Sequence, residues 1–277
     1  MSTVAELLSE ARRLSLEDAP LLLAHVLGKD RGWLFAWPEH RLDDVQLKQY
    51  RQLLERRRQG EPLAYLTGER EFWSLALEVS PAVLIPRPET ELLVELALNL
   101  DLPESIQVLE LGTGSGAIAI ALATERPDWQ ITATDTSAAA LAIARGNAAR
   151  HQAPNLDFIQ GHWYQALSGD GKYQLILSNP PYVMAGDPHL LEDGLPWEPP
   201  EALTAGSDGL ADLRIIISEA PAHLLPDADG WLLVEHGYDQ GKAVRDLFRK
   251  AGFSQVITRQ DLGGKDRVTL GCYPPRP

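Results

Sequence analysis

From Ile106 onward, short apolar runs typical of strands alternate with longer runs that have helical spacing. The strand-like runs end near Leu111, Asp135, Gln160 and Ser178, and further runs occupy 231–235, 255–258 and 267–272. Helical patterns fill 115–126, 138–150, 208–225 and 240–251. Repeated βα units predict a mostly parallel sheet with helices on both faces. Because no helix separates the last two strands, we expect them to form an antiparallel hairpin at one edge.

The N-terminal part of the chain lacks this alternation and consists of short helical runs. Thr3 and Glu6 have the spacing of a capping box at the start of the first helix. We expect three segments: a helical domain at 1–70, a hairpin and proline-rich connector at 71–88, and an α/β domain at 89–277. The predicted fold class is therefore α/β, with a Rossmann-like, seven-stranded, mostly parallel sheet and a small helical N-terminal domain.

The amino-acid composition restricts the possible partners and the cellular compartment of this protein. The net charge is −14 and the pI is about 4.9, whereas a protein that tracks a phosphate backbone usually carries a basic stripe. We therefore expect no direct nucleic-acid partner. Cys272 is the only cysteine, so no internal disulfide can form, which fits a reducing compartment. With no signal-peptide pattern and no apolar run long enough for a bilayer, we expect a cytoplasmic protein that does not enter membranes.

A glycine-rich turn follows the first strand of the α/β region. Gly112, Gly114 and Gly116 allow a tight turn and let a ligand approach the N–H groups at a helix start. Asp135 closes the next strand about 20 residues later, where a carboxylate can accept the ribose hydroxyls of an adenosine cofactor. The alternatives are a purely structural turn for the glycines and a helix N-cap for Asp135. Together the two features predict an adenosine cofactor and leave NAD and S-adenosylmethionine open.

The segment Asn179-Pro180-Pro181-Tyr182 follows a buried strand pattern and separates these two cofactors. Its prolines remove two N–H donors and fix φ, so the turn is stiff and presents acceptors. The Asn179 side-chain oxygen and the Pro180 carbonyl can each accept one N–H of a planar NH₂ group, on which Tyr182 can stack. A nicotinamide enzyme would need a hydride-site acid, and the sequence shows no such signature. The alternative is an ordinary Asn-Pro-Pro turn.

Together these motifs resemble those of class I S-adenosylmethionine-dependent methyltransferases that act on amino groups. Other segments resemble the release-factor glutamine methyltransferases, the HemK/PrmC family: Ala64-Tyr65-Leu66-Thr67-Gly68, Leu84-Ile85-Pro86-Arg87-Pro88-Glu89-Thr90-Glu91, Glu198-Pro199 with Ala202-Leu203, and Glu235-His236-Gly237. The similarity covers nearly the whole chain, including the helical N-terminal region. DNA enzymes that methylate adenine share the Asn-Pro-Pro-Tyr motif but not these flanking segments.

The resemblance implies methyl transfer from S-adenosylmethionine to the side-chain amide nitrogen (N5) of glutamine in the Gly-Gly-Gln motif of class I peptide-chain release factors. The product of the cofactor would be S-adenosylhomocysteine. By the same resemblance, the cofactor would be held by Gly112, Thr113, Gly114, Ser115, Gly116, Asp135, Trp163 and Asn179. The glutamine would be bound by Asn179, Pro180, Pro181 and Tyr182, of which Asn179, Pro180 and Tyr182 would be catalytic. We expect a monomer whose N-terminal helices dock the release factor.

One departure from the family concerns His162. Family members often have an acidic residue just before the tryptophan that flanks the adenine, which is Trp163 here. Arg87, Glu89 and Glu198 have no assigned role and are candidates for structural salt bridges. No metal is expected, because the seven histidines show no ligand-like spacing with cysteine or carboxylates.

Three other functions are left to weigh. A ribosomal-protein glutamine methyltransferase would use the same chemistry on another partner. A DNA adenine-N6 methyltransferase is opposed by the net charge of −14 and by the absence of a target-recognition insert. A non-catalytic protein that retains the fold is opposed by the intact glycine loop and Asn-Pro-Pro-Tyr segment.

Overall fold

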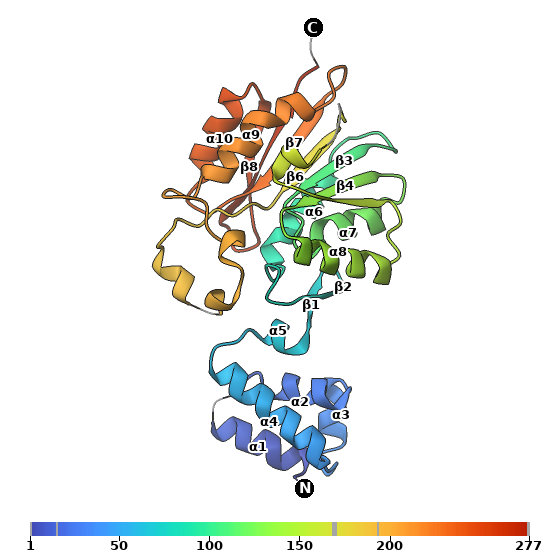
Figure 1. Ribbon diagram of the computed structural model, residues 1–277, viewed down its shortest axis with the longest axis vertical. Helices are drawn as coiled ribbons and strands as arrows, with labels where there is room; N and C mark the ends of the chain where they lie inside the picture. Colours follow the sequence, from blue (N-terminus) through green and yellow to red (C-terminus); the bar gives the residue numbers. More distant parts are fainter. Residues whose placement is uncertain (1, 15, 168–170, 193, 276–277) are drawn as a thin grey trace. The chain divides into compact units, whose positions relative to one another are not determined.

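The computed structural model describes residues 2–14, 16–167, 171–192 and 194–275 (Figure 1). The chain divides into two compact units. The first comprises Met1–Glu69 with Leu191–Trp197, and the second comprises Arg70–Leu190 with Glu198–Pro277. The segment Leu191–Trp197 thus belongs with the N-terminal helices although it lies far along the chain. The predicted connector at 71–88 falls within the second unit.

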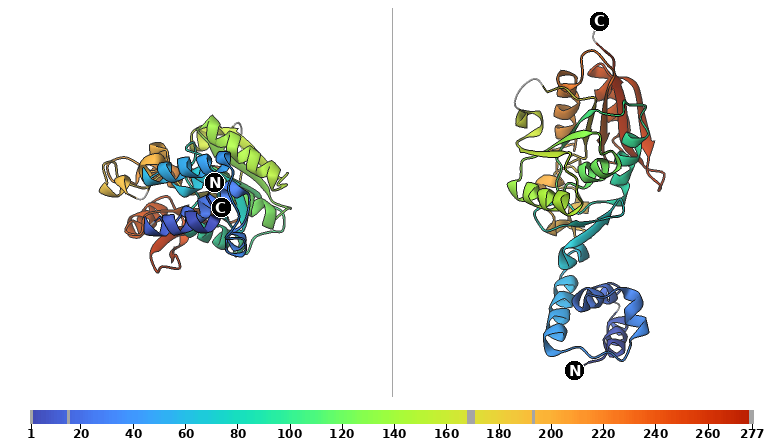
Figure 2. Two further views of the ribbon diagram at one scale, coloured as in Figure 1. Left: turned by 90° about the horizontal axis from the view of Figure 1, so that it is seen from below. Right: turned by 90° about the vertical axis from the view of Figure 1, so that its right-hand side faces the viewer.

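Within the described residues, the first unit has five α-helices: α1 (Val4–Arg13), α2 (Ala19–Leu27), α3 (Arg31–Ala36), α4 (Asp44–Arg58) and α5 (Leu63–Thr67). They appear together in blue and cyan in Figure 2. The Thr3 hydroxyl accepts the Glu6 N–H (3.2 Å), and the Glu6 carboxylate accepts the Thr3 N–H (2.9 Å). The predicted capping box is therefore confirmed. Apolar side chains of the helices form a core of their own.

The second unit is built on a sheet whose seven strands, within the described residues, are β3 (Gln107–Leu111), β4 (Gln130–Asp135), β5 (Leu156–Gln160), β6 (Leu175–Ser178), β7 (Gly230–Glu235), β8 (Ser254–Gln260) and β9 (Asp266–Tyr273). Their order is β5-β4-β3-β6-β7-β9-β8, and β9 runs in the opposite direction to the other six. The predicted mostly parallel sheet and its C-terminal antiparallel hairpin at the edge are confirmed. A separate two-stranded sheet joins β1 (Glu69–Phe72) and β2 (Leu75–Glu78).

Helices cover both faces of the large sheet (Figure 1). In the described part of this unit the five α-helices are α6 (Glu91–Leu98), α7 (Ala117–Glu125), α8 (Ala138–Arg150), α9 (Ala211–His223) and α10 (Gly241–Lys250). Successive strand residues point to opposite faces. In β3, Val108 packs in the core that includes α6 and α7, whereas Leu109 packs in the core that includes α9 and α10. This two-sided burial explains why β6 is mainly apolar rather than alternating, and why the buried part of β3 is apolar except for Glu110.

The chain changes direction across the sheet at β3. After β3 it moves outward through β4 and β5, and it then returns to place β6 on the other side of β3. Ligands of open α/β sheets bind beyond the carboxyl ends of the strands at such a point. The register pairs Leu111 with both Thr134 and Ser178. The glycine loop, Asp135 and Asn179 therefore emerge side by side at this edge.

Candidate active site

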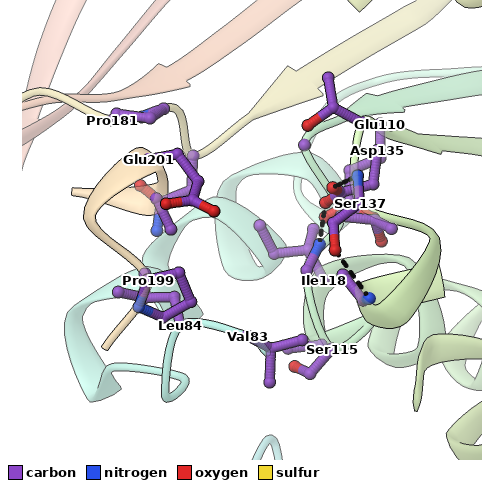
Figure 3. A pocket seen from close by; sticks show the side chains of 18 of the residues that line it. Val83, Leu84, Glu110, Ser115, Ile118, Asp135, Ser137, Pro181, Pro199 and Glu201 are labelled. Atoms are coloured by element: carbon purple, nitrogen blue, oxygen red, sulfur yellow. Dashed lines mark hydrogen bonds between the residues drawn. The ribbon is translucent and has the colours of Figure 1, made fainter. Parts of the chain in front are cut away.

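A pocket of about 270 Å³ lies at this edge of the sheet, within the second unit (Figure 3). Most residues predicted to bind cofactor or substrate line it: Gly112, Thr113, Gly114, Ser115, Asp135, Trp163, Asn179 and Pro181. Three predicted residues, Gly116, Pro180 and Tyr182, are not among its lining residues. The structure thus brings the glycine loop and part of the Asn-Pro-Pro-Tyr segment to one cavity, while the roles of these residues stay predictions.

The three loop glycines all have positive φ, with values of 74° at Gly112, 56° at Gly114 and 84° at Gly116. Each also has a different steric environment. A Cβ atom at Gly112 would lie 3.1 Å from the ring of Trp163, and one at Gly116 would lie 2.9 Å from the Ile120 side chain. The space beside Gly114 is open. Glycine at position 112 therefore leaves room for the Trp163 ring, and glycine at position 116 lets the Ile120 side chain of α7 pack closely. At Gly114 only the positive φ calls for glycine.

The Asp135 carboxylate holds the glycine loop against the end of β4. One oxygen accepts the Gly114 N–H and the other accepts the Ser137 N–H, each at 2.8 Å. The N-cap of α8 is Ser137, whose hydroxyl accepts the Ala140 N–H. The alternative of a helix N-cap at Asp135 is therefore wrong. Because each carboxylate oxygen has two lone pairs, Asp135 retains acceptor capacity on the pocket it lines.

Glu110 is a buried carboxylate of the pocket that the sequence reasoning did not single out. Its Oε2 accepts the Thr113 hydroxyl at 2.6 Å and the Ala119 N–H at 3.1 Å. Burial raises the pKa of Glu110 from its ordinary value of 4.5 to about 7, against the opposite effect of these two hydrogen bonds. The sequence feature that could have indicated Glu110 as a pocket residue is a carboxylate inside an apolar strand directly before the glycine loop.

Trp163 forms one wall of the pocket and is fixed by a residue from another helix. Its indole Nε1 donates to Asp212 at 3.3 Å, and Asp212 belongs to α9. His162 also lines the pocket and packs edge-on against Trp163, with ring centroids 5.4 Å apart. Asp212 was not predicted, because nothing near it in the sequence connects it with Trp163.

Carboxylates dominate the charge of this pocket. Four of them line it: Glu110, Asp135, Glu201 and Asp212. Figure 3 shows Glu201 and Pro181 on the side of the pocket opposite Asp135 and Ser137. The guanidinium that lines the pocket, Arg87, is ion-paired with Glu198. Charge complementarity therefore favours a cationic ligand over one that carries phosphates.

The Arg87–Glu198 pair confirms one of the candidate salt bridges. The side chain of Glu198 is almost completely buried. Besides Arg87, it accepts the Ile85 N–H at 3.0 Å. Glu198 therefore ties together two loops that border the pocket, the one before α6 and the one before α9.

Hydrogen bonds with residues outside the segment hold the Asn-Pro-Pro-Tyr segment in place. The Asn179 Nδ2 donates to the Thr90 hydroxyl oxygen at 3.1 Å. The Tyr182 hydroxyl donates to the Glu235 carboxylate at 3.1 Å, and the Tyr182 carbonyl accepts from Gln240 at 2.9 Å. Asn179 thus faces the pocket, whereas Tyr182 is held by groups outside the pocket lining. Stacking of Tyr182 on a substrate stays a prediction.

Residues 2–14, 16–167, 171–192 and 194–275 hold neither a cluster of metal-ligating side chains nor a membrane-spanning helix. No group of three or more histidine, cysteine, aspartate or glutamate side chains in that part of the chain is arranged to hold a metal ion. No helix there has the length and apolarity needed to cross a membrane.

A seven-stranded sheet of this order, with a carboxylate-rich pocket between a glycine loop and an Asn-Pro-Pro-Tyr turn, defines an α/β methyltransferase. Solved structures agree on the fold. A methyltransferase from Pyrococcus furiosus is 20% identical, with a TM-score of 0.53 over 72% of this chain and 89% of its own. The catalytic domain of hMettl16 is 15% identical, with a TM-score of 0.57 over 84% of this chain and 82% of its own.

Sequence comparison identifies the family. Residues 2–68 match the PrmC N-terminal domain, and residues 88–191 match the methyltransferase small domain. The release factor glutamine methyltransferase of Pseudomonas aeruginosa is 49% identical over 280 residues, covering 99% of both chains. That of Vibrio cholerae is 52% identical over 256 residues, covering 92% of this chain and 89% of its own. The chain belongs to the release factor glutamine methyltransferase family, as its resemblance predicted, and is an enzyme.

Proposed function

We propose that this enzyme transfers a methyl group from S-adenosylmethionine to the side-chain amide nitrogen (N5) of the glutamine in the Gly-Gly-Gln motif of class I peptide-chain release factors. S-adenosylhomocysteine would be the second product. The observation that carries the proposal is the shared cavity of the glycine loop and Asn179. A cofactor held by the loop would place its reactive end beside a residue suited to an amide group.

The residues present fit S-adenosylmethionine better than NAD. Asp135 has the acceptor capacity for ribose hydroxyls, and Trp163 offers an aromatic wall for an adenine. The carboxylates of the pocket suit a sulfonium and an ammonium group, whereas the pyrophosphate of a dinucleotide would meet like charge. When bound, S-adenosylmethionine supplies a methyl group that its sulfonium already activates.

The remaining task of the protein is to present the amide nitrogen, which is a poor nucleophile because its lone pair is delocalised into the carbonyl. The Asn179 side-chain oxygen and the Pro180 carbonyl would each accept one amide N–H. These acceptors orient the NH₂ group and favour the positive charge that develops on nitrogen during transfer. Good orientation of the two reactants contributes on the order of 7–11 kcal/mol. Tyr182 and Pro181 would complete the glutamine site.

The helical first unit is the proposed docking surface for the release factor, since a tripeptide alone offers little area for specificity. The match of residues 2–68 to the PrmC N-terminal domain favours a release factor over a ribosomal protein as partner. The net charge of −14 opposes DNA as the substrate. A monomer in the cytoplasm is the expected form and location.

The test is mass spectrometry of purified release factor after incubation with this enzyme and S-adenosylmethionine. The expected product carries one added methyl group, located on the Gly-Gly-Gln peptide. Asn179→Ala is expected to abolish methylation while retaining cofactor binding, because Asn179 supplies one of the two amide acceptors. Asn99→Ala, an exposed asparagine at the end of α6, is the matched control and should act like wild type. Equal loss of cofactor binding and of methylation in Asn179→Ala would contradict the assigned role.

A further inference from the structure

Behind the pocket, at the end of β7, lies a buried carboxylate that the proposed reaction does not use. The register pairs Ser178 with Val234, so Glu235 lies beside Asn179 where both strands end. Glu235 is 1% exposed. Its Oε1 accepts the Tyr182 hydroxyl, whereas its Oε2 has no partner within ordinary hydrogen-bond geometry among the described residues. A buried acceptor without a donor needs an explanation.

Thr90 stands between Glu235 and Asn179. It is 4% exposed, and its hydroxyl oxygen accepts the Asn179 Nδ2–H at 3.1 Å. Thr90 is the N-cap of α6, which packs against β7, and its hydroxyl lowers the pKa of the Glu235 carboxyl, as do Arg267 and the Tyr182 hydroxyl. Burial acts more strongly in the other direction and raises the pKa of Glu235 to about 7, with a further contribution from Glu89.

The donors and acceptors on these groups determine the direction of the hydrogen bonds that would run from Asn179 through Thr90 to Glu235. An ionised carboxylate can only accept, and a threonine hydroxyl has one proton to donate. If the Thr90 proton is directed at Glu235, the lone pairs of Thr90 are left for Asn179. The Asn179 amide must then turn its nitrogen to Thr90, which leaves Oδ1 for the pocket.

We propose that Glu235 and Thr90 are positioning residues that hold the Asn179 amide with its oxygen toward the substrate. This inference rests on the proposed function, in which that oxygen accepts an N–H of the glutamine amide. A flipped Asn179 would oppose its own NH₂ group to the NH₂ group of the substrate, and two donors cannot bond. In its ionised form, which predominates above a pH of about 7, the Glu235 carboxylate therefore excludes the unproductive orientation without touching the substrate.

The test compares Thr90→Val, which keeps the shape but removes the hydroxyl, with Thr90→Ser, which keeps the hydroxyl. Thr124→Val, a half-buried threonine on α7 outside the pocket lining, controls for the general cost of this exchange. We expect Thr90→Val to lower kcat for methylation of release factor at least tenfold, equivalent to about 1.4 kcal/mol. The Kd for S-adenosylmethionine should stay within twofold, and Thr90→Ser should restore most of kcat. Glu235→Gln should lower kcat in the same way, because an amide can also donate to Thr90.

An unchanged kcat in Thr90→Val would overturn this inference but not the proposed function. Equal losses of kcat in Thr90→Ser and Thr90→Val would do the same. Absence of methylation by the wild-type enzyme would instead refute the proposed function, and the inference with it. Should the variants fail to fold, the wild-type enzyme labelled with ¹⁵N-asparagine provides a second readout by NMR. One Asn179 Nδ2 proton should be protected from solvent exchange, and two unprotected protons would overturn the inference.

Discussion

Replacing Glu110 by glutamine should make the protein more resistant to alkaline pH. The two side chains have nearly the same shape, and glutamine retains an oxygen for the Thr113 hydroxyl and the Ala119 N–H. The substitution therefore removes the charge of a side chain that is 1% exposed with little change in packing.

The magnitude follows from the raised pKa. At a pH below 4.5 the carboxyl is protonated in both the folded and the unfolded chain. As the pH rises toward 7, the unfolded chain loses its proton first, so the free energy of unfolding falls, and it levels off above the folded pKa of about 7. Since one pKa unit corresponds to about 1.4 kcal/mol, the whole effect is roughly 3 kcal/mol. Between pH 5.5 and 8.5 it is about 2 kcal/mol.

The assay is urea denaturation of wild type and Glu110→Gln at several pH values in this range, which lies above the pI of about 4.9. Wild type should lose about 2 kcal/mol more than the variant between the two ends. Any cost of the new NH₂ group is the same at every pH, and Glu235 titrates in both proteins. The difference in pH dependence therefore isolates Glu110. Glu104→Gln removes an exposed carboxylate and should leave the wild-type pH dependence unchanged.

Parallel curves for wild type and Glu110→Gln would refute the reasoning. They would mean that Glu110 has the same affinity for protons in the folded and the unfolded chain, and hence that the two hydrogen bonds fully offset its burial.

Two further predictions concern ligands. Asp135→Ala should weaken S-adenosylmethionine binding at least tenfold in calorimetry, because hydrogen bonds to charged groups contribute about 1.5–3 kcal/mol each; an unchanged Kd would rule out the ribose contact. Exchanging both Phe35 and Trp37, exposed aromatic residues of the first unit, for serine should raise KM for intact release factor about tenfold while the Kd for the cofactor stays unchanged. An unaltered KM would argue against docking through this part of the helical unit.

Local patterns determined the architecture of this protein. Strands such as β3 and β6 are buried on both faces, so their apolar runs predict a parallel sheet flanked by helices. The positive φ values at Gly112, Gly114 and Gly116 favour residues without a Cβ. The glycines in the sequence therefore predict the tight turn of this loop. The capping box at Thr3 and Glu6 was equally local. These features depend on residues a few positions apart, which a sequence displays directly.

Only the tertiary structure decided which distant groups meet at the site. Asp212 reaches Trp163 across 49 positions of sequence, and Thr90 reaches Asn179 across 89. The Tyr182 hydroxyl turns to Glu235 because β6 and β7 are neighbours in the sheet, a contact that its sequence context did not indicate. Contacts of this kind depend on strand order and register, and apolar patterning specifies which face of a strand is buried but not which strand lies beside it.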